Sequence, residues 1–172
     1  MARRSTLVAL VLASTFAVLA AAAETTPPPA AAPAPAMAEM RGGALQWGPL
    51  DLPGFVPGMK VSVLAGDPFK PGDYTLRLLF PAGYAFPAHW HPNVENLTVV
   101  SGTLKLGMGD KTDAAKIKSY APGDYLYIPP QMPHFGGADV ETVIQLHGPG
   151  PFGVTVIEAM EGALPGPPAP AP

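Results

Sequence analysis

Residues 83–102 read GYAFPAHWHPNVENLTVVSG, and a second stretch, residues 123–134, reads GDYLYIPPQMPH. The first stretch contains His89, His91 and Glu95 between two glycines, and the second ends in His134. The chain has only four histidines, so three of them fall into one spaced pattern. These two stretches decide both the fold and the site that the sequence predicts.

The spacing of the histidines suits a metal site. His89 and His91 lie two positions apart, so their imidazoles point to the same side of a strand. Glu95 has the same parity but follows a Pro-Asn pair, which predicts a turn between it and the two histidines. Three imidazoles and one carboxylate suit Fe, Mn, Ni, Cu or Zn and disfavour Ca²⁺ and Mg²⁺. We therefore expect one divalent transition metal, with Fe or Mn favoured because four protein ligands on an octahedral ion leave two positions open.

The order of glycines, ligands and prolines in these stretches resembles the two signature motifs of the cupin superfamily. The first motif matches at every defining position, as Gly83-x5-His89-x-His91-x3-Glu95-x6-Gly102. In the second, Gly123-x5-Pro129-x4-His134, Gln131 replaces the usual Gly and Ala138 the usual Asn, and neither is a metal ligand in the family. The resemblance covers residues 83–102 and 123–134 in motif and 45–158 in fold. It implies a jelly-roll (double-stranded β-helix) barrel, often dimeric, whose metal is held by the residues matching His89, His91, Glu95 and His134.

The middle of the chain reads as short strands separated by turns. Apolar and polar residues alternate over 59–64, 74–80, 94–100, 103–108, 116–120, 124–128, 141–146 and 154–157, with turn-forming residues between them. This pattern, without a convincing amphipathic helix, predicts an all-β sandwich or barrel. The runs 94–100 and 103–108 flank Ser101-Gly102, which predicts a hairpin between them. The pair Gly136-Gly137 is expected to make the chain flexible after His134.

The two ends of the chain differ in composition from the middle. Residues 1–23 read as a secretory signal peptide, with two arginines, an apolar run and three alanines before Glu24. The alternative is an N-terminal membrane anchor, but the apolar run is short for a span of about 20 residues. Residues 24–40 are a Pro/Ala-rich linker and residues 161–172 a Pro-rich tail, both expected to be disordered, and residues 41–160 form the cupin-like domain. A cleaved signal predicts a periplasmic or secreted protein with no stable membrane span after processing.

Composition and charge exclude several classes of function. The 172 residues are enough for one domain. The net charge is −3 and Lys and Arg form no run, so nucleic acid is not an expected partner. The absence of cysteine excludes structural disulfides, Cys-ligated zinc and thiol nucleophiles.

Two functions remain open from the sequence. The first is a non-haem metal-dependent oxygenase acting on a small organic molecule, in which Glu95 binds the metal and also moves protons as a catalytic residue. The alternative is a non-catalytic barrel that holds or senses a small ligand or a metal, which the small size favours. Whether the protein is an enzyme stays open, and the resemblance adds the expectation of a homodimer. Tyr84, Phe86 and Tyr127 are expected to pack inside the barrel. His147 is expected to lie in a turn at a strand end, and the alternative is a role beside the ligands or in the pocket.

Overall fold

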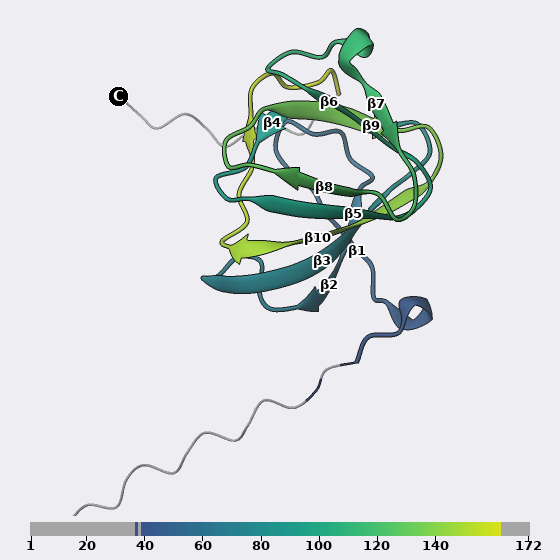
Figure 1. The fold of residues 1–172 in the computed structure, drawn as a ribbon, viewed down its shortest axis with the longest axis vertical. Helices are drawn as coiled ribbons and strands as arrows, with labels where there is room; N and C mark the ends of the chain where they lie inside the picture. Colours follow the sequence, from purple (N-terminus) through teal and green to yellow (C-terminus); the bar gives the residue numbers. More distant parts are fainter. Residues whose placement is uncertain (1–36, 38, 163–172) are drawn as a thin grey trace, which may run out of the picture. The chain divides into compact units, whose positions relative to one another are not determined.

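The computed structural model describes residue 37 and residues 39–162, which fold into two antiparallel sheets (Figure 1). The six-stranded sheet has the order β1-β2-β3-β10-β5-β8, with bounds Gly48–Pro49, Lys60–Ala65, Gly72–Phe80, Thr142–Gly150, Glu95–Ser101 and Tyr125–Ile128. The five-stranded sheet has the order β11-β4-β9-β6-β7, with bounds Thr155–Val156, Tyr84–Trp90, His134–Ala138, Leu104–Met108 and Lys118–Tyr120. The predicted signal peptide, most of the predicted linker and residues 163–172 of the predicted tail lie outside the described residues.

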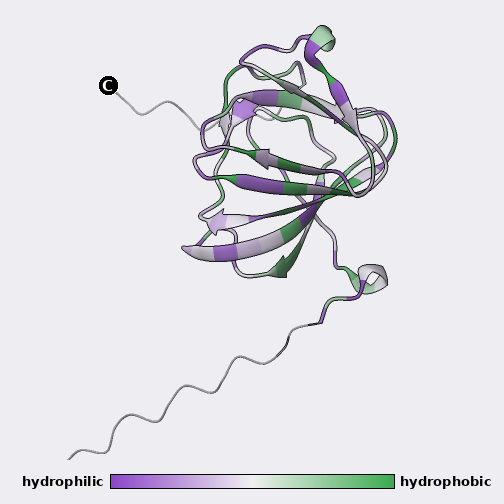
Figure 2. Cartoon of the chain, viewed as in Figure 1, coloured by the Kyte–Doolittle hydropathy of each residue, from purple (hydrophilic) through white to green (hydrophobic). Residues whose placement is uncertain are grey.

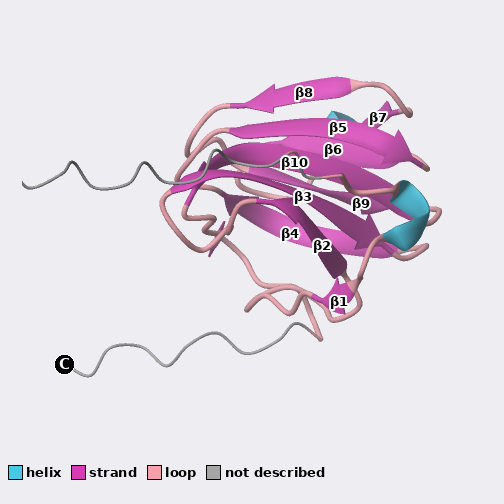
Figure 3. Cartoon of the chain, turned by 90° about the horizontal axis from the view of Figure 1, so that it is seen from below, coloured by secondary structure: helices cyan, strands magenta, loops and turns pink. Residues whose placement is uncertain are grey.

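Helix is almost absent from the described part of the chain. Two single turns of 3-10 helix, η1 (Gly42–Ala44) and η2 (Ala114–Lys116), are cyan in Figure 3 beside the magenta strands. Within residues 39–162, no helix has the length and apolar character needed to cross a bilayer.

The strands form antiparallel pairs that are nested one inside the next along the chain. β3 pairs with β10, β4 with β9, β5 with β8 and β6 with β7, all antiparallel. Each step from β3 to β6 moves the chain to the other sheet, and the steps from β7 to β10 return it in reverse order. Such nesting of antiparallel strands in two facing sheets is the jelly-roll arrangement. The all-β jelly-roll prediction is therefore confirmed.

Apolar side chains fill the space between the sheets. Every second residue of β3 is buried, from Tyr74 to Phe80, and β10 buries Ile144 and Leu146 in the same alternation. Figure 2 shows the resulting bands of hydrophobic and hydrophilic residues along the strands. Each fully buried Leu or Phe stabilises the fold by about 1.5–3 kcal/mol through removal of apolar surface from water. The barrel interior is therefore a packed core into which the site residues are set.

The predicted hairpin between residues 94–100 and 103–108 is wrong. The corresponding strands, β5 and β6, lie in different sheets, and β5 instead pairs with β8 and β10. Gly102 has φ 76°, and a Cβ there would lie 2.3 Å from the carbonyl oxygen of Glu141. The Thr142 hydroxyl accepts a hydrogen bond from the Thr103 amide at 3.0 Å, which fixes the link against the start of β10. The turn signal was real, but it marks a crossing between sheets because both edges of β5 are taken by later strands.

Gly136 and Gly137 are part of β9, which corrects the expectation of a flexible segment. A Cβ at Gly136 would lie 2.0 Å from the carbonyl oxygen of Lys105, and one at Gly137 would lie 2.3 Å from that of Tyr84. Glycine is needed here because β9 runs between β4 and β6 at very close approach. The pair therefore tightens the sheet that carries His134.

Candidate metal centre

A bulge in β4 directs the first histidine into the barrel. Phe86 pairs with Gly136 and His89 with His134, so three steps along β4 match two steps along β9. The extra residue lets Phe86 and His89 both face the interior although their positions differ in parity. Pro87 lies in this bulge, a position where a strand tolerates proline because no ladder hydrogen bond is lost.

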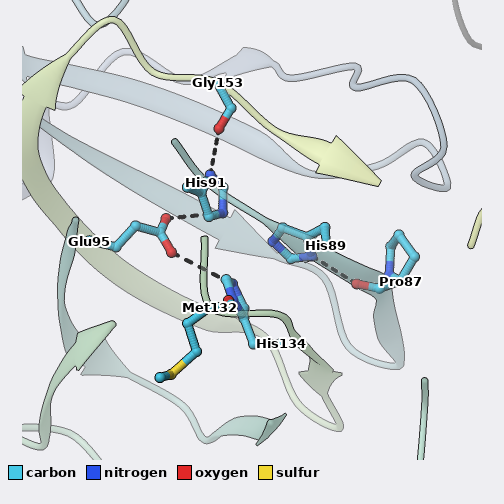
Figure 4. Close-up of polar contacts among 7 residues, drawn as sticks. All are labelled: Pro87, His89, His91, Glu95, Met132, His134 and Gly153. Carbon is cyan, nitrogen blue, oxygen red and sulfur yellow. Dashed lines mark hydrogen bonds and ion pairs between the residues drawn. The ribbon is translucent and has the colours of Figure 1, made fainter. Parts of the chain in front are cut away.

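The four predicted ligands come from both sheets and meet in the barrel interior (Figure 4). His89 on β4 and His134 at the start of β9 lie directly opposite each other, with ring centroids 4.3 Å apart. His91 follows the end of β4, and Glu95 opens β5 in the six-stranded sheet. All four side chains belong to buried residues, with exposures of 3–7%. The structure thus brings together every residue that the sequence predicted for the site.

A main-chain carbonyl holds each histidine in one tautomer. The Nδ1–H groups of His89, His91 and His134 donate to carbonyl oxygens at 2.7, 2.7 and 3.0 Å, and these belong to Pro87, Gly153 and Met132 respectively (Figure 4). A carbonyl can only accept, so each Nδ1 carries the proton and each Nε2 keeps a free lone pair. One ligand atom from each ring lies within 4.8 Å of the other two. Metal-binding imidazoles are held in this way, by a hydrogen bond at the nitrogen that does not bind the ion.

Burial keeps the site uncharged in the metal-free protein. Desolvation lowers the pKa of His89 well below its ordinary 6.5 and that of His91 to about 4, and repulsion from neighbouring imidazoles adds to both shifts. Desolvation also lowers the pKa of His134. The same cause raises the pKa of the Glu95 carboxyl from 4.5 to about 8. At neutral pH the three imidazoles are neutral and Glu95 is mostly protonated.

Glu95 contacts two of the three histidines. Its carboxyl oxygens lie 3.3 Å from His91 Nε2 and 3.6 Å from His134 Nε2. Such distances would suit an ion pair between charged groups. The pKa shifts make both partners neutral in the metal-free protein, so these are polar contacts between neutral groups. The set of mutually close ligand atoms within 4.8 Å comprises the three histidines alone. Glu95 therefore stands beside the histidine cluster, in reach of an ion placed there.

Besides Phe86, two phenylalanine rings that the sequence did not predict lie beside the histidines. The centroid of Phe55 lies 5.1 Å from that of His89, and Phe152 lies 5.2 Å from His91. Phe55 precedes β2 and Phe152 follows β10, so no spacing connects either to the motifs. The three carbonyl acceptors were missed for another reason, because every residue has a carbonyl and the sequence does not say which one will face a ring.

A small cavity adjoins the four site residues. It has a volume of about 50 Å³ and is lined by the four site residues and thirteen apolar side chains of the described chain. Most of the apolar lining is core, and only Leu52, Phe152 and Val154 are half-buried, which places the approach from solvent near them. The lining of the cavity is thus apolar apart from the four site residues.

Burial settles four other aromatic or histidine positions. Tyr84 and Phe86 are buried as expected, and the Tyr84 hydroxyl donates to the Val56 carbonyl at 2.8 Å. Tyr127 is 61% exposed on β8, so its expected place inside the barrel is wrong. His147 lies in the middle of β10 and is exposed on the outer face, which corrects the expectation of a strand-end turn. Alternation along each strand decides these outcomes, since Tyr127 and His147 have outward parity.

The comparisons with known proteins agree with this fold. The family model for the Cupin domain matches residues 76–143, a range that includes all four predicted ligands. The chain belongs to the cupin superfamily. A search of curated proteins found no match.

Solved structures similar to this cupin share its fold at low sequence identity. The polyketide cyclase RemF from Streptomyces resistomycificus has a TM-score of 0.62 at 17% identity, and the match covers 74% of this chain and 89% of that chain. A cupin 2 conserved barrel domain protein from Rhodopseudomonas palustris has a TM-score of 0.54 at 16% identity, with 69% and 83% covered. An RmlC-like cupin from Shewanella frigidimarina has a TM-score of 0.49 at 20% identity, with 64% and 87% covered. The first two structures share the fold of this cupin, and identities this low carry no activity over to it.

Proposed function

We propose that this cupin binds one divalent transition metal through His89, His91, His134 and Glu95. The orientation of the three imidazoles carries the proposal, because each Nδ1–H donates to a carbonyl and the ligand atoms lie within 4.8 Å of one another. The lowered pKa values of the three histidines support the same role, since an imidazole must be neutral to bind a metal.

Glu95 is the proposed fourth ligand. Its two oxygens lie 3.3 and 3.6 Å from Nε2 atoms of the cluster, on the side of the other sheet. A cation between the imidazoles would attract the carboxyl group and favour its ionised form over the protonated form that burial imposes. The barrel thus offers a ligand set of three nitrogens and one oxygen.

Iron or manganese is the proposed ion. Three imidazoles and a carboxylate also suit Ni, Cu and Zn, but a tetrahedral zinc would be nearly closed by four protein ligands. An octahedral ion would keep two positions that the four side chains do not fill. Such an ion, when bound, supplies Lewis-acid and redox chemistry.

The proposed reaction class is oxygen-dependent oxidation of a small molecule. Glu95 would then be the catalytic residue that holds or moves a proton, because it is the one carboxyl group among the described residues that line the cavity. Non-catalytic binding of a small ligand is the second candidate. It is favoured by the dry lining, which offers a substrate no further acid, base or hydrogen-bonding side chain from the described chain. Oxygen consumption by the metal-loaded protein with candidate small molecules would separate the two.

Export to the periplasm or beyond, with removal of residues 1–23, is proposed from the sequence of that segment. N-terminal sequencing of the protein from the exported fraction should find a start at or near Glu24. A start at Met1 or Ala2 on a membrane-bound form would contradict cleavage.

A homodimer is proposed on the side of the six-stranded sheet. Its edge strand β8 carries Tyr125 and Tyr127, which are 56% and 61% exposed. Exposed tyrosines on an edge strand are typical of an interface, because an aromatic ring buries a large area and the strand edge offers free hydrogen-bonding groups. A sedimentation mass near one mature chain at micromolar concentration would contradict the dimer.

The test of the metal proposal is elemental analysis of the full chain purified from its native compartment. We expect about one transition metal ion per chain in the wild type and none in the double variant His89→Ala/His91→Ala. The control is His147→Ala, which removes an exposed imidazole of the outer face and should leave the metal content unchanged. Equal metal content in the double variant and the wild type would refute the site.

A further inference from the structure

The size of the interior cavity restricts what can reach the site. Its volume of about 50 Å³ is a third of that of an engineered cavity of about 150 Å³, which stays dry and binds benzene. On this scale the cavity has room for about two to four non-hydrogen atoms. A six-membered ring does not fit unless the wall moves.

The wall is formed by the packed core, which opposes such movement. Leu97 on β5 and Leu146 on β10 lie opposite each other in register and are 4% and 3% exposed. Leu104 on β6 closes the cavity from the other sheet and has no exposed surface. Forcing additional volume into a packed interior is unfavourable, because side chains leave their preferred rotamers.

The polarity of the cavity restricts the ligand further. The polar side-chain atoms that the described residues direct at it belong to the site, and the three Nδ1–H groups are already bonded to carbonyls. A second polar group on a ligand would be buried without a partner, which weakens binding. The lining therefore matches a ligand with one donor atom turned to the histidines and an otherwise apolar or very small remainder.

We infer that the cavity admits only a diatomic or triatomic molecule, or a chain of about four non-hydrogen atoms with a single donor atom, and excludes an aromatic substrate. The inference deepens the proposed function and rests on it for the ion that would hold the donor atom. The size and the apolar lining of the cavity stand without the ion, so one part of the test uses metal-free protein.

The metal-free part of the experiment uses xenon and benzene as probes on the full chain treated with chelator. Xenon should bind saturably by ¹²⁹Xe NMR, and benzene should leave the melting temperature of the wild type unchanged. Leu97→Ala should gain stabilisation by benzene because it enlarges the cavity, and Leu146→Ala serves as a second enlarging variant. His147→Ala is the control, since it changes an exposed residue of the outer face and leaves the cavity as it is. Stabilisation of the wild type by benzene, or failure of xenon to bind, would overturn the inference.

The metal-loaded part uses Co²⁺ as a spectroscopic probe, with azide and benzoate as ligands. Azide should change the visible spectrum of the wild type, and benzoate should do so only in Leu97→Ala. Benzoate binding to the wild type as tight as azide binding would overturn the size restriction. If Co²⁺ does not bind, the proposed function fails, and the xenon and benzene results still decide the inference about the cavity. If the protein folds only with metal, the azide and benzoate results decide it.

Discussion

The two faces of the six-stranded sheet are made by alternating residues of the same strands, and they have opposite environments. In β5, Glu95 points into the barrel while its neighbour Asn96 points outward. In β10, Leu146 lines the cavity while His147 is exposed on the outer face. An imidazole or a carboxyl group becomes a candidate ligand here through the face it occupies, because only the inner face removes it from water and surrounds it with other donors.

The largest expected difference between the faces is in stability. Leu146→Ala should lower the free energy of unfolding by about 2–5 kcal/mol, because it removes buried methyl groups and leaves a cavity. His147→Ala, one residue further on the outer face, should change it by about 0.5 kcal/mol or less. Urea unfolding of both variants measures the difference. Similar losses in the two variants would mean that the outer face is packed against something that the isolated chain does not show.

The second difference concerns metal and stability together. At a hundredfold excess over its dissociation constant, a ligand that binds only the folded state stabilises it by about 2.7 kcal/mol. Chelation at pH 7 should therefore lower the melting temperature of the wild type and of His147→Ala alike. In His134→Ala the effect of the chelator should be much smaller, because β9 no longer supplies a ligand. If chelator removes the metal from the wild type without changing its melting temperature, the ion does not hold the barrel together.

The pH dependence of the metal-free protein tests the inner face alone. The three histidines have folded pKa values below their ordinary 6.5, so the stability they contribute is complete above pH 6.5 and is lost as the pH falls toward 4. Glu95 has a folded pKa raised from 4.5 to about 8, so its contribution is complete below 4.5 and is lost as the pH rises toward 8. As the pH falls below 6.5, the stability lost through three histidines exceeds the stability regained through one glutamate. We therefore expect maximum stability near pH 6.5.

Urea midpoints of chelator-treated protein across this pH range measure the profile. Glu95→Gln should remove the decline between pH 6.5 and 8, because the amide does not titrate, and should leave the acid side in place. If the loss of stability above pH 6.5 persists in Glu95→Gln, a group other than Glu95 causes it.

The smallest expected difference separates two asparagines. Asn93 donates to the carbonyls of Pro149 and Pro151 at 3.1 and 3.0 Å, in the segment that leads to the Gly153 carbonyl bonded to His91. Asn96 donates to the His147 carbonyl at 3.1 Å on the outer face. Asn93→Ala should weaken metal binding about tenfold, as expected for a group that orients a ligand through its partner. Asn96→Ala should leave metal affinity unchanged. Competitive metal titration measures both variants, and equal effects would mean that Asn93 does not help to position His91.

The sequence by itself determined the fold class and the identity of the residues that meet in the barrel. Alternation of period two and frequent turn residues are local signals, and they were enough for an all-β chain. The His-x-His pair needed only strand geometry to predict a common face, and the motif as a whole carried the resemblance to cupins. These features depend on neighbours in the chain and can be read without knowing what packs against what.

The tertiary structure alone decided the pairing of strands and the environment of each side chain. The turn at Gly102 looks like a hairpin locally, but the two edges of β5 pair with β8 and β10, which come later in the chain. The pair Gly136-Gly137 reads as flexible until the carbonyl of Lys105 is seen to leave no room for a side chain. The Gly153 carbonyl that fixes the tautomer of His91 lies 62 residues further along the chain, and the walls of the apolar cavity come from strands of both sheets. Long-range packing sets these properties, and no local pattern encodes which distant backbone atom will face a given ring.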